Sequence, residues 1–215
     1  MNKIQQIVQI FETGTLSNRG YGTVTVAKDG QNGALQISYG IFQITEFGNL
    51  KELLQSYIDV GGRYARELLP YMGALGTSPS KATDLKFRHI LFLAGGDTLM
   101  HACQDRYFYG KYFKPAETWA KRVGFKTQLA LLVVYDSYIH SGGMPTYLLN
   151  RVKISTSNEK EFIKEYVNVR HAWLANHSKK ILNNCIYRTE TFKHLIANDD
   201  WELTKVTQVR GVKLG

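Results

Sequence analysis

Apolar residues recur with a helical period along most of this chain. The first such stretch has apolar side chains at positions i, i+3, i+4 and i+7, namely Ile4, Ile7, Val8 and Phe11. This spacing puts them on one face of a helix. Because Gly14 is a residue that ends helices, we expect the first helix to reach Glu12 and to stop just beyond it.

The pattern changes between residues 20 and 40. Valines and threonines alternate in the run Thr23-Val24-Thr25-Val26, and glycine stands at positions 20, 22, 30, 33 and 40. Alternation of this kind indicates a strand, and frequent glycine is typical of turns. We therefore expect a small β element here, made of short strands joined by turns.

The rest of the chain returns to the helical pattern. Asn49 with Glu52 three residues on resembles a capping box, and Gly95-Gly96 is a weak point in an otherwise helical run. A loop at 73–80, which contains Pro79, is the expected crossing between two lobes. We expect further helices at about 49–58, up to 69, and over 84–108, 127–140, 159–180 and 188–197.

Length and charge narrow the class of protein. The chain has 215 residues, which suits a single domain, 1–215, with two lobes sharing a core. Lys and Arg number 27 against 18 Asp and Glu, a net charge of +9. Such a field favours encounter with anionic polymers over cationic ones. The basic residues are spread out and match no named nucleic-acid motif, so we expect no nucleic-acid partner.

The cysteines and the apolar runs argue against a zinc protein and against a membrane protein. Cys103 and Cys185 form no C-x-x-C pair, so we expect no zinc site and two small buried apolar residues. We also expect no other metal and no organic cofactor. No apolar run approaches the length of a membrane span. No secretory leader is visible, which fits a mature form or a cytosolic product released by a separate route.

Two carboxylates in the first 30 residues could form a catalytic pair. Glu12 closes the first helix, and Asp29 stands on a glycine-flanked loop. Glycoside hydrolysis needs one carboxyl to protonate the leaving oxygen and a second to activate water or to attack. On local grounds alone, Glu12 could equally be a solvated helix-end acid, and Asp29-Gly30 a common hairpin turn.

The motifs around these acids resemble those of a known family. Glu12-Thr13-Gly14, Tyr21-Gly22, Asp29-Gly30 and Ser38-Tyr39-Gly40-Ile41-Phe42-Gln43 resemble the family 46 chitosanases of the lysozyme superfamily. The first and last of these motifs are also similar to goose-type lysozymes and lytic transglycosylases. The resemblance covers nearly the whole chain, continuing through Gln104-Asp105-Arg106-Tyr107-Phe108, Pro115-Ala116, Tyr135-Asp136-Ser137-Tyr138-Ile139-His140 and Tyr187-Arg188.

This resemblance implies a mainly α, α+β lysozyme-like fold, in which two helical lobes and a small β-hairpin element flank a substrate cleft. It also implies an inverting mechanism with Glu12 as general acid and Asp29 as general base. Family chitosanases usually carry a threonine a few residues beyond this aspartate, which helps to hold the attacking water. This chain has Gln31-Asn32-Gly33-Ala34 instead, which would move that task to Asn32 or to another group.

Three charged residues stand in apolar helical contexts. They are Asp136, Arg170 and Arg188. A buried carboxylate must be paired or shifted toward neutrality. The resemblance implies that the three form a buried network that supports the base, and such a network would also hold the two lobes together.

Other residues are candidates for contact with sugar. Tyr39 could stack on a sugar ring or pack in the core, and Gln43 could line the cleft. His140, before Ser141-Gly142-Gly143, could bond to sugar or be a satisfied histidine at a helix end. Glu46 is a further acid that could pair with glucosamine amines.

The sequence thus predicts an enzyme that cleaves a β-1,4-linked amino-sugar polymer, acting extracellularly or on the cell wall as a monomer without membrane insertion. Chitosan is the substrate that the resemblance implies. The positive charge favours peptidoglycan, cleaved by a phage endolysin or a delivered antibacterial effector. A non-catalytic carbohydrate-binding or structural protein on the same fold is the third interpretation, since the segment after Asp29 departs from the family pattern.

Overall fold

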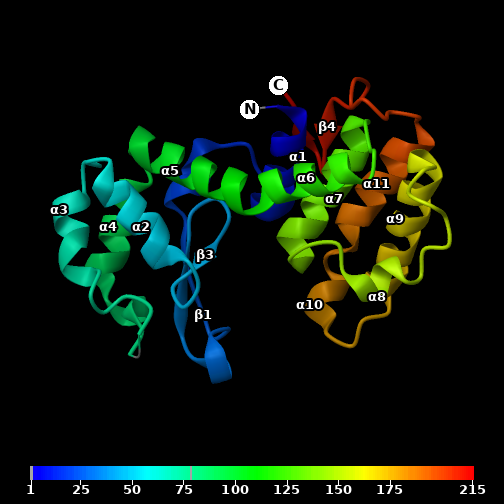
Figure 1. Cartoon of the computed structure of the whole chain (residues 1–215). Helices are drawn as coiled ribbons and strands as arrows, with labels where there is room; N and C mark the ends of the chain where they lie inside the picture. Colours follow the sequence, from blue (N-terminus) through cyan, green and yellow to red (C-terminus); the bar gives the residue numbers. More distant parts are fainter. Residues whose placement is uncertain (1, 78) are drawn as a thin grey trace. The chain divides into compact units, whose positions relative to one another are not determined.

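The computed structural model describes residues 2–77 and 79–215, without the side chains of Asn18, Arg19 and Gln31. Its contacts divide the chain into two compact units (Figure 1). The terminal unit is Met1–Phe11 with Gly110–Gly215, and the central unit is Glu12–Tyr109. The chain therefore passes between units after Phe11 and after Tyr109, and the loop at 73–80, expected to be the crossing, lies inside the central unit.

Buried Glu46 explains why that loop belongs to the central unit. Its side chain is 0% exposed and accepts hydrogen bonds from the Lys81 N–H, at 2.7 Å, and from the Ser80 hydroxyl. These bonds tie the end of the loop to the residue that follows the sheet. The expectation that Glu46 meets glucosamine amines is wrong, because the carboxylate is enclosed and already has its partners.

The central unit contains the predicted β element. Strands β1 (Val24–Ala27), β2 (Gln36–Tyr39) and β3 (Ile44–Thr45) form an antiparallel sheet in the order β1-β2-β3. Val24 pairs with Tyr39 and Ala27 with Gln36. Ile37 and Tyr39 are 0% exposed, so one face of β2 packs into the core of this unit.

Helices make up most of the rest of the central unit. They are α2 (Leu50–Asp59), α3 (Ala65–Leu68), α4 (Leu85–Ala94) and α5 (Thr98–Phe108), with 3-10 turns at Asn18–Gly22, Gln31–Gly33, Leu69–Tyr71 and Lys81–Thr83. The single helix expected over 84–108 is in fact α4 and α5. Asp97 starts the second of them by accepting the Leu99 N–H at 3.0 Å. At α2, Asn49 makes no capping bond to the backbone; its amide donates to Glu52 at 3.0 Å.

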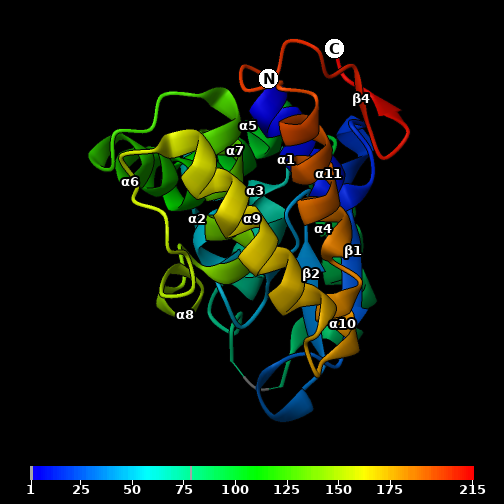
Figure 2. The same cartoon turned by 90° about the vertical axis from the view of Figure 1, so that its right-hand side faces the viewer.

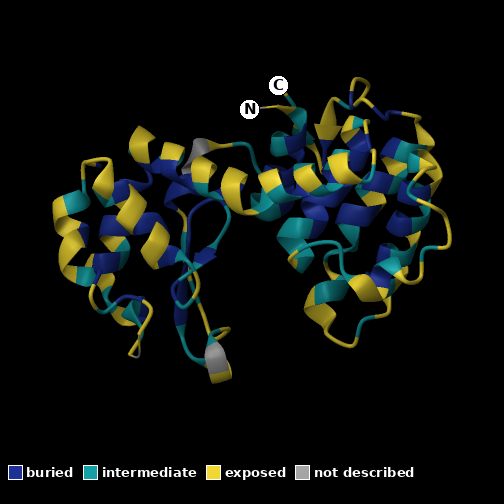
Figure 3. Cartoon of the chain, viewed as in Figure 1, coloured by how far each residue is buried: buried dark blue, intermediate teal, exposed yellow. Residues whose placement is uncertain are grey.

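The terminal unit is built on helix α7 (Gln128–Ser141), which Figure 3 shows largely in the colour of buried residues. Helices α9 (Glu159–Ala175) and α11 (Ile186–Ala197) pack against α7 and run side by side in Figure 2. The remaining helices of this unit are α1 (Lys3–Thr13, up to Phe11), α6 (Lys114–Arg122), α8 (Thr146–Leu149) and α10 (Lys180–Asn183). A π-helical turn, Tyr109–Phe113, joins α5 to α6.

Two differences from expectation lie toward the C-terminus. Helix α9 ends at Ala175 rather than near 180, and the tail forms a hairpin of β4 (Gln208–Val209) and β5 (Val212–Lys213). The cysteines also differ from each other. Cys103 is buried as expected, Cys185 is half-buried, and both are free thiols. Among the described residues, no helix has the length and apolar character that a membrane crossing requires.

Candidate active site

Glu12 lies in the last turn of α1 and is half-buried. The residue before it is held by α11: the Tyr187 hydroxyl donates to the Phe11 carbonyl oxygen at 2.7 Å, and the rings of Phe11 and Tyr187 meet edge to face. Gly14 has φ +72, a left-handed conformation that suits glycine, and the helix ends there as predicted. The last turn of α1 is therefore fixed just before the candidate acid.

Asp29 lies in the connection between β1 and β2 and is exposed. Gly30 is required beside it, because a Cβ there would lie 2.7 Å from the Ala34 carbonyl oxygen. The Gly30 N–H donates to this same oxygen at 2.9 Å. The candidate base thus stands on a tight loop whose backbone is closed by its own hydrogen bonds.

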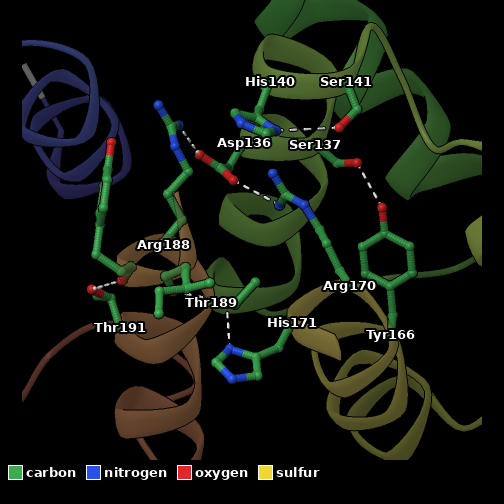
Figure 4. Close-up of polar contacts among 12 residues, drawn as sticks. Asp136, Ser137, His140, Ser141, Tyr166, Arg170, His171, Arg188, Thr189 and Thr191 are labelled. Carbon is green, nitrogen blue, oxygen red and sulfur yellow. Dashed lines mark hydrogen bonds and ion pairs between the residues drawn. The ribbon is translucent and has the colours of Figure 1, made fainter. Parts of the chain in front are cut away.

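The structure brings Asp136, Arg170 and Arg188 together in the core of the terminal unit (Figure 4). Asp136 comes from α7 and lies between the two arginines, with contacts of 2.7 Å to Arg170 from α9 and 2.6 Å to Arg188 from α11. Burial alone would raise the pKa of Asp136, but the two guanidinium groups hold it below its ordinary value. The carboxylate is therefore ionised and joins three helices.

Arg188 also connects this cluster with α1. Its guanidinium lies 5.4 Å from the centre of the Phe11 ring and 5.5 Å from that of Tyr187. A cation over an aromatic face is attracted by the ring quadrupole. The charged cluster therefore contacts the residue that directly precedes Glu12.

His140 stands one helical turn after Asp136 on α7, beside the cluster (Figure 4). Burial and then the positive charges of Arg170 and Arg188 lower the pKa of His140 to about 4. The imidazole is thus neutral at neutral pH, although it lies at a helix C-terminus, where the dipole would favour its charged form. A neutral imidazole can still accept or donate a hydrogen bond, so its contact with sugar stays a prediction.

The two remaining candidates are Tyr39, the last residue of β2, and Gln43, in the turn between β2 and β3. Tyr39 is 0% exposed, and its hydroxyl donates to the Leu91 carbonyl oxygen at 2.9 Å, so it packs in the core and offers no face to sugar. Gln43 is half-buried, donates to the Gly40 carbonyl oxygen at 2.8 Å and accepts a bond from Thr25. Gln43 is therefore engaged in shaping its own turn, and its contact with substrate stays a prediction.

Comparison with known proteins decides the family. The sequence model of glycosyl hydrolase family 46 matches residues 6–206. The chain belongs to glycosyl hydrolase family 46. It is thus a glycoside hydrolase, as the order of its motifs predicted.

Individual relatives of this family 46 protein are chitosanases. The chain is 25% identical to the chitosanase of Bacillus subtilis (strain 168) over 232 residues, which cover 99% of this chain and 82% of the relative. A mutant chitosanase from Bacillus subtilis MY002 complexed with 6 GlcN is 20% identical, with a TM-score of 0.75 over 94% of this chain and 90% of that one. The Gynuella sunshinyii chitosanase in complex with chitotetraose is 18% identical, with a TM-score of 0.75 over 95% and 93%.

These likenesses confirm the lysozyme-like fold of the family 46 protein. They do not favour the peptidoglycan-cleaving interpretation or the non-catalytic one. The motifs pointed to the correct family, whereas the net charge, which had pointed to an anionic polymer, gave no sign of it.

Sequence reasoning missed one residue of the family 46 candidate site. Gln36, at the start of β2, donates from Nε2 to the Asp29 Oδ1 at 3.0 Å. The available signal was a polar residue placed seven positions after Asp29, where the alternation of the strand begins. That signal does not show which way the side chain turns, so the contact could not be predicted.

Proposed function

We propose that this family 46 hydrolase is an endo-acting chitosanase that cleaves β-1,4-linked glucosamine polymer with inversion. The observation that carries the proposal is an exposed carboxylate, Asp29, which stands on a hairpin loop and is held by Gln36, in a chain that matches family 46 over residues 6–206. Chitosanase relatives in complex with glucosamine oligomers support the choice of substrate. Because the substrate is a polymer, we place the reaction outside the cell.

In the proposed reaction, Glu12 donates its proton to the glycosidic oxygen as the bond from that oxygen to the anomeric carbon breaks. Asp29 takes a proton from a water molecule, whose oxygen bonds to the anomeric carbon from the opposite face. Glu12 ends the cycle as a carboxylate and Asp29 as a carboxylic acid, and exchange with solvent restores both. Room for the water implies carboxyl groups about 6.5–9.5 Å apart in the substrate complex.

The buried cluster has a supporting role in this proposal. Arg188 contacts Phe11, and Tyr187 holds the Phe11 carbonyl oxygen, so α11 holds the residue that directly precedes Glu12. Asp136 fixes Arg188 in turn. We assign Asp136, Arg170 and Arg188 to positioning of the acid and to stability, with no direct contact with the reacting atoms.

The first test is a pair of conservative variants. Glu12→Gln and Asp29→Asn should each release reducing ends from soluble chitosan about 10²–10⁴-fold more slowly than the wild type, because each removes a proton donor or acceptor. Glu67→Gln, at an exposed acid on α3, is the matched control and should keep full activity. No release of reducing ends by the wild type would overturn the substrate assignment, and near-normal turnover by Glu12→Gln would overturn the role of Glu12.

The stereochemistry has a separate test. An inverting enzyme acting on a β-linkage releases the α-anomer first, and early NMR spectra of the products distinguish the two anomers. Initial appearance of the β-anomer would indicate a covalent intermediate on the enzyme and retention.

A further inference from the structure

The amide of Gln36 is buried beside the candidate base. Gln36 is 5% exposed and pairs with Ala27 at the end of the β1–β2 ladder. Since side chains alternate along a strand, it lies on the face of β2 opposite to the core residue Ile37. Burying an amide costs free energy unless its polar atoms have hydrogen-bond partners. The partners of the Gln36 amide therefore indicate its role.

The partners of Gln36 fix which way the amide faces. The Phe47 backbone N–H can only donate, and it points to Oε1 of Gln36 in a long contact of 3.5 Å. Nε2 therefore faces the other way, toward Asp29, where it donates to Oδ1 at 3.0 Å. The chemistry of the neighbours settles the assignment of amide oxygen and nitrogen.

The carboxylate of Asp29 is held at one oxygen only. Among the described residues, Oδ1 accepts the bond from Gln36, and Oδ2 has no hydrogen-bond partner. The backbone of the loop is closed by two bonds, from Gly30 N–H to Ala34 O at 2.9 Å and from Gly33 N–H to Gly30 O at 3.0 Å. One oxygen is thus anchored to the sheet, and the other is available to water.

We propose that Gln36 is a positioning residue for the general base: it holds Oδ1 of Asp29, so that Oδ2 is aimed at the attacking water. The inference rests on the proposed function. It offers a physical answer to the missing threonine after Asp29, because a group from β2 orders the carboxylate in a chain whose segment 31–34 has no threonine.

The test compares two leucine variants. Gln36→Leu removes the donor and keeps a similar volume. Gln55→Leu is the matched control, because the Gln55 amide donates to the Asp59 carboxylate at 2.8 Å in the same way, on an exposed part of α2. Gln36→Leu should lower kcat on chitosan on the order of 10- to 100-fold with KM within about twofold, since a misplaced catalytic group slows the chemical step. Gln55→Leu should match the wild type.

The pH profile separates positioning from a merely structural role. In Gln36→Leu, the acid limb of the profile of kcat/KM should move to higher pH, because a carboxylate that loses a donor binds its proton more readily. Gln36→Glu should move the limb further. It keeps an acceptor for the Phe47 N–H but sets a second carboxyl against Asp29, and such pairs share a proton. A destabilised fold alone would lower activity without moving this limb.

A double-mutant cycle completes the test. In the background of Asp29→Ala, Gln36→Leu should have no further effect on the residual rate, because the two residues act as one unit. Additive effects, or a Gln36→Leu variant with wild-type kcat and an unmoved acid limb, would overturn the inference while leaving the chitosanase assignment intact. If the wild type proves inactive on chitosan, the contact can still be tested by an NMR titration of the Asp29 carboxyl in the wild type and in Gln36→Leu. Two identical titrations would overturn the contact.

Discussion

At Asp136, the terminal unit buries a carboxylate between two guanidinium groups. Two arginines and one aspartate leave one positive charge in excess, and His140 beside them is neutral. Removing one partner of a buried cluster strands the others, which typically costs about 3–5 kcal/mol. Asp136→Ala should therefore lower the melting temperature strongly, together with activity. Asp59→Ala, at an exposed acid on α2, should leave both nearly unchanged. Equal melting temperatures would contradict the role of the cluster.

The lowered pKa of His140 leads to a second prediction at the residue scale. Its pKa is lowered from 6.5 to about 4 in the folded protein, so the unfolded chain binds more protons between these two values. The stability contributed by neutral His140 is complete above about pH 6.5 and is lost as the pH falls toward 4. At about 1.4 kcal/mol for one pKa unit, the loss is on the order of 3 kcal/mol.

Chemical denaturation across this pH range measures the loss. His140→Gln should flatten the dependence of stability on pH, whereas His89→Gln, at an exposed histidine on α4, should not. Burial also lowers the pKa of His171, so part of the slope should survive in His140→Gln. A slope equal to that of the wild type would show that His140 is not the titrating group.

The sequence predicted these residues unequally well. Asp136 could be recognised because a charge within an apolar helix must find a partner. The sequence could not show whether Tyr39 packs in the core or faces the substrate. All four residues of β2 are buried, so alternation along the strand does not tell its two faces apart. Gln36 was missed because its contact with Asp29 spans seven residues across a loop.

At the scale of elements, the sequence predicted helices well and short strands poorly. The helix of residues 127–140 was found within one residue because Thr127 caps α7 and left-handed Gly142 ends it. The C-terminal hairpin was missed because its strands have two residues each and show no alternation. Its turn, with positive φ at Arg210 and Gly211, is stabilised by Arg210, which lies 3.9 Å from the centre of the Tyr187 ring.

A substitution at Gly40 can test how the sheet is attached to α5. It has φ +78, and a Cβ there would overlap with the Gln104 side-chain oxygen. Gln104 is 0% exposed, donates to the Tyr21 carbonyl oxygen at 2.9 Å and accepts the Ile41 N–H at 3.1 Å. Gly40→Ala should displace this amide and break both bonds, at a cost of roughly 2–4 kcal/mol beyond the backbone strain.

Gly124→Ala is the matched control for this prediction, because Gly124 also has positive φ, +86, with nothing within 4 Å of the added Cβ. Both variants share the backbone strain, so the difference between their unfolding free energies isolates the contact with Gln104. If the two variants lose equal stability, Gln104 does not hold the sheet to α5.

At the scale of the whole molecule, the excess charge belongs to one unit. The central unit has nine Lys and Arg and nine Asp and Glu, whereas the terminal unit has 18 basic residues against nine acidic ones, so the entire +9 lies on the terminal unit. The total was available from the sequence, but this division was not, because the first eleven residues join the C-terminal half. Glu12 and Asp29 thus belong to a unit with no net charge.

This division predicts how salt changes the rate on chitosan. Below the pKa of its amines, chitosan is a polycation that the terminal unit repels, and salt shortens the Debye length from about 10 Å at 0.1 M to about 3 Å at 1 M. The value of kcat/KM should therefore rise with added salt, because screening speeds the encounter.

Reversing two exposed charges of the terminal unit, in Lys179→Glu with Lys180→Glu, should raise kcat/KM at low salt and weaken the salt dependence. The pair Lys179→Arg with Lys180→Arg keeps the charge and should behave as the wild type. A rate that instead falls steadily with salt would mean that acidic groups at the substrate site attract the polymer more strongly than the terminal unit repels it.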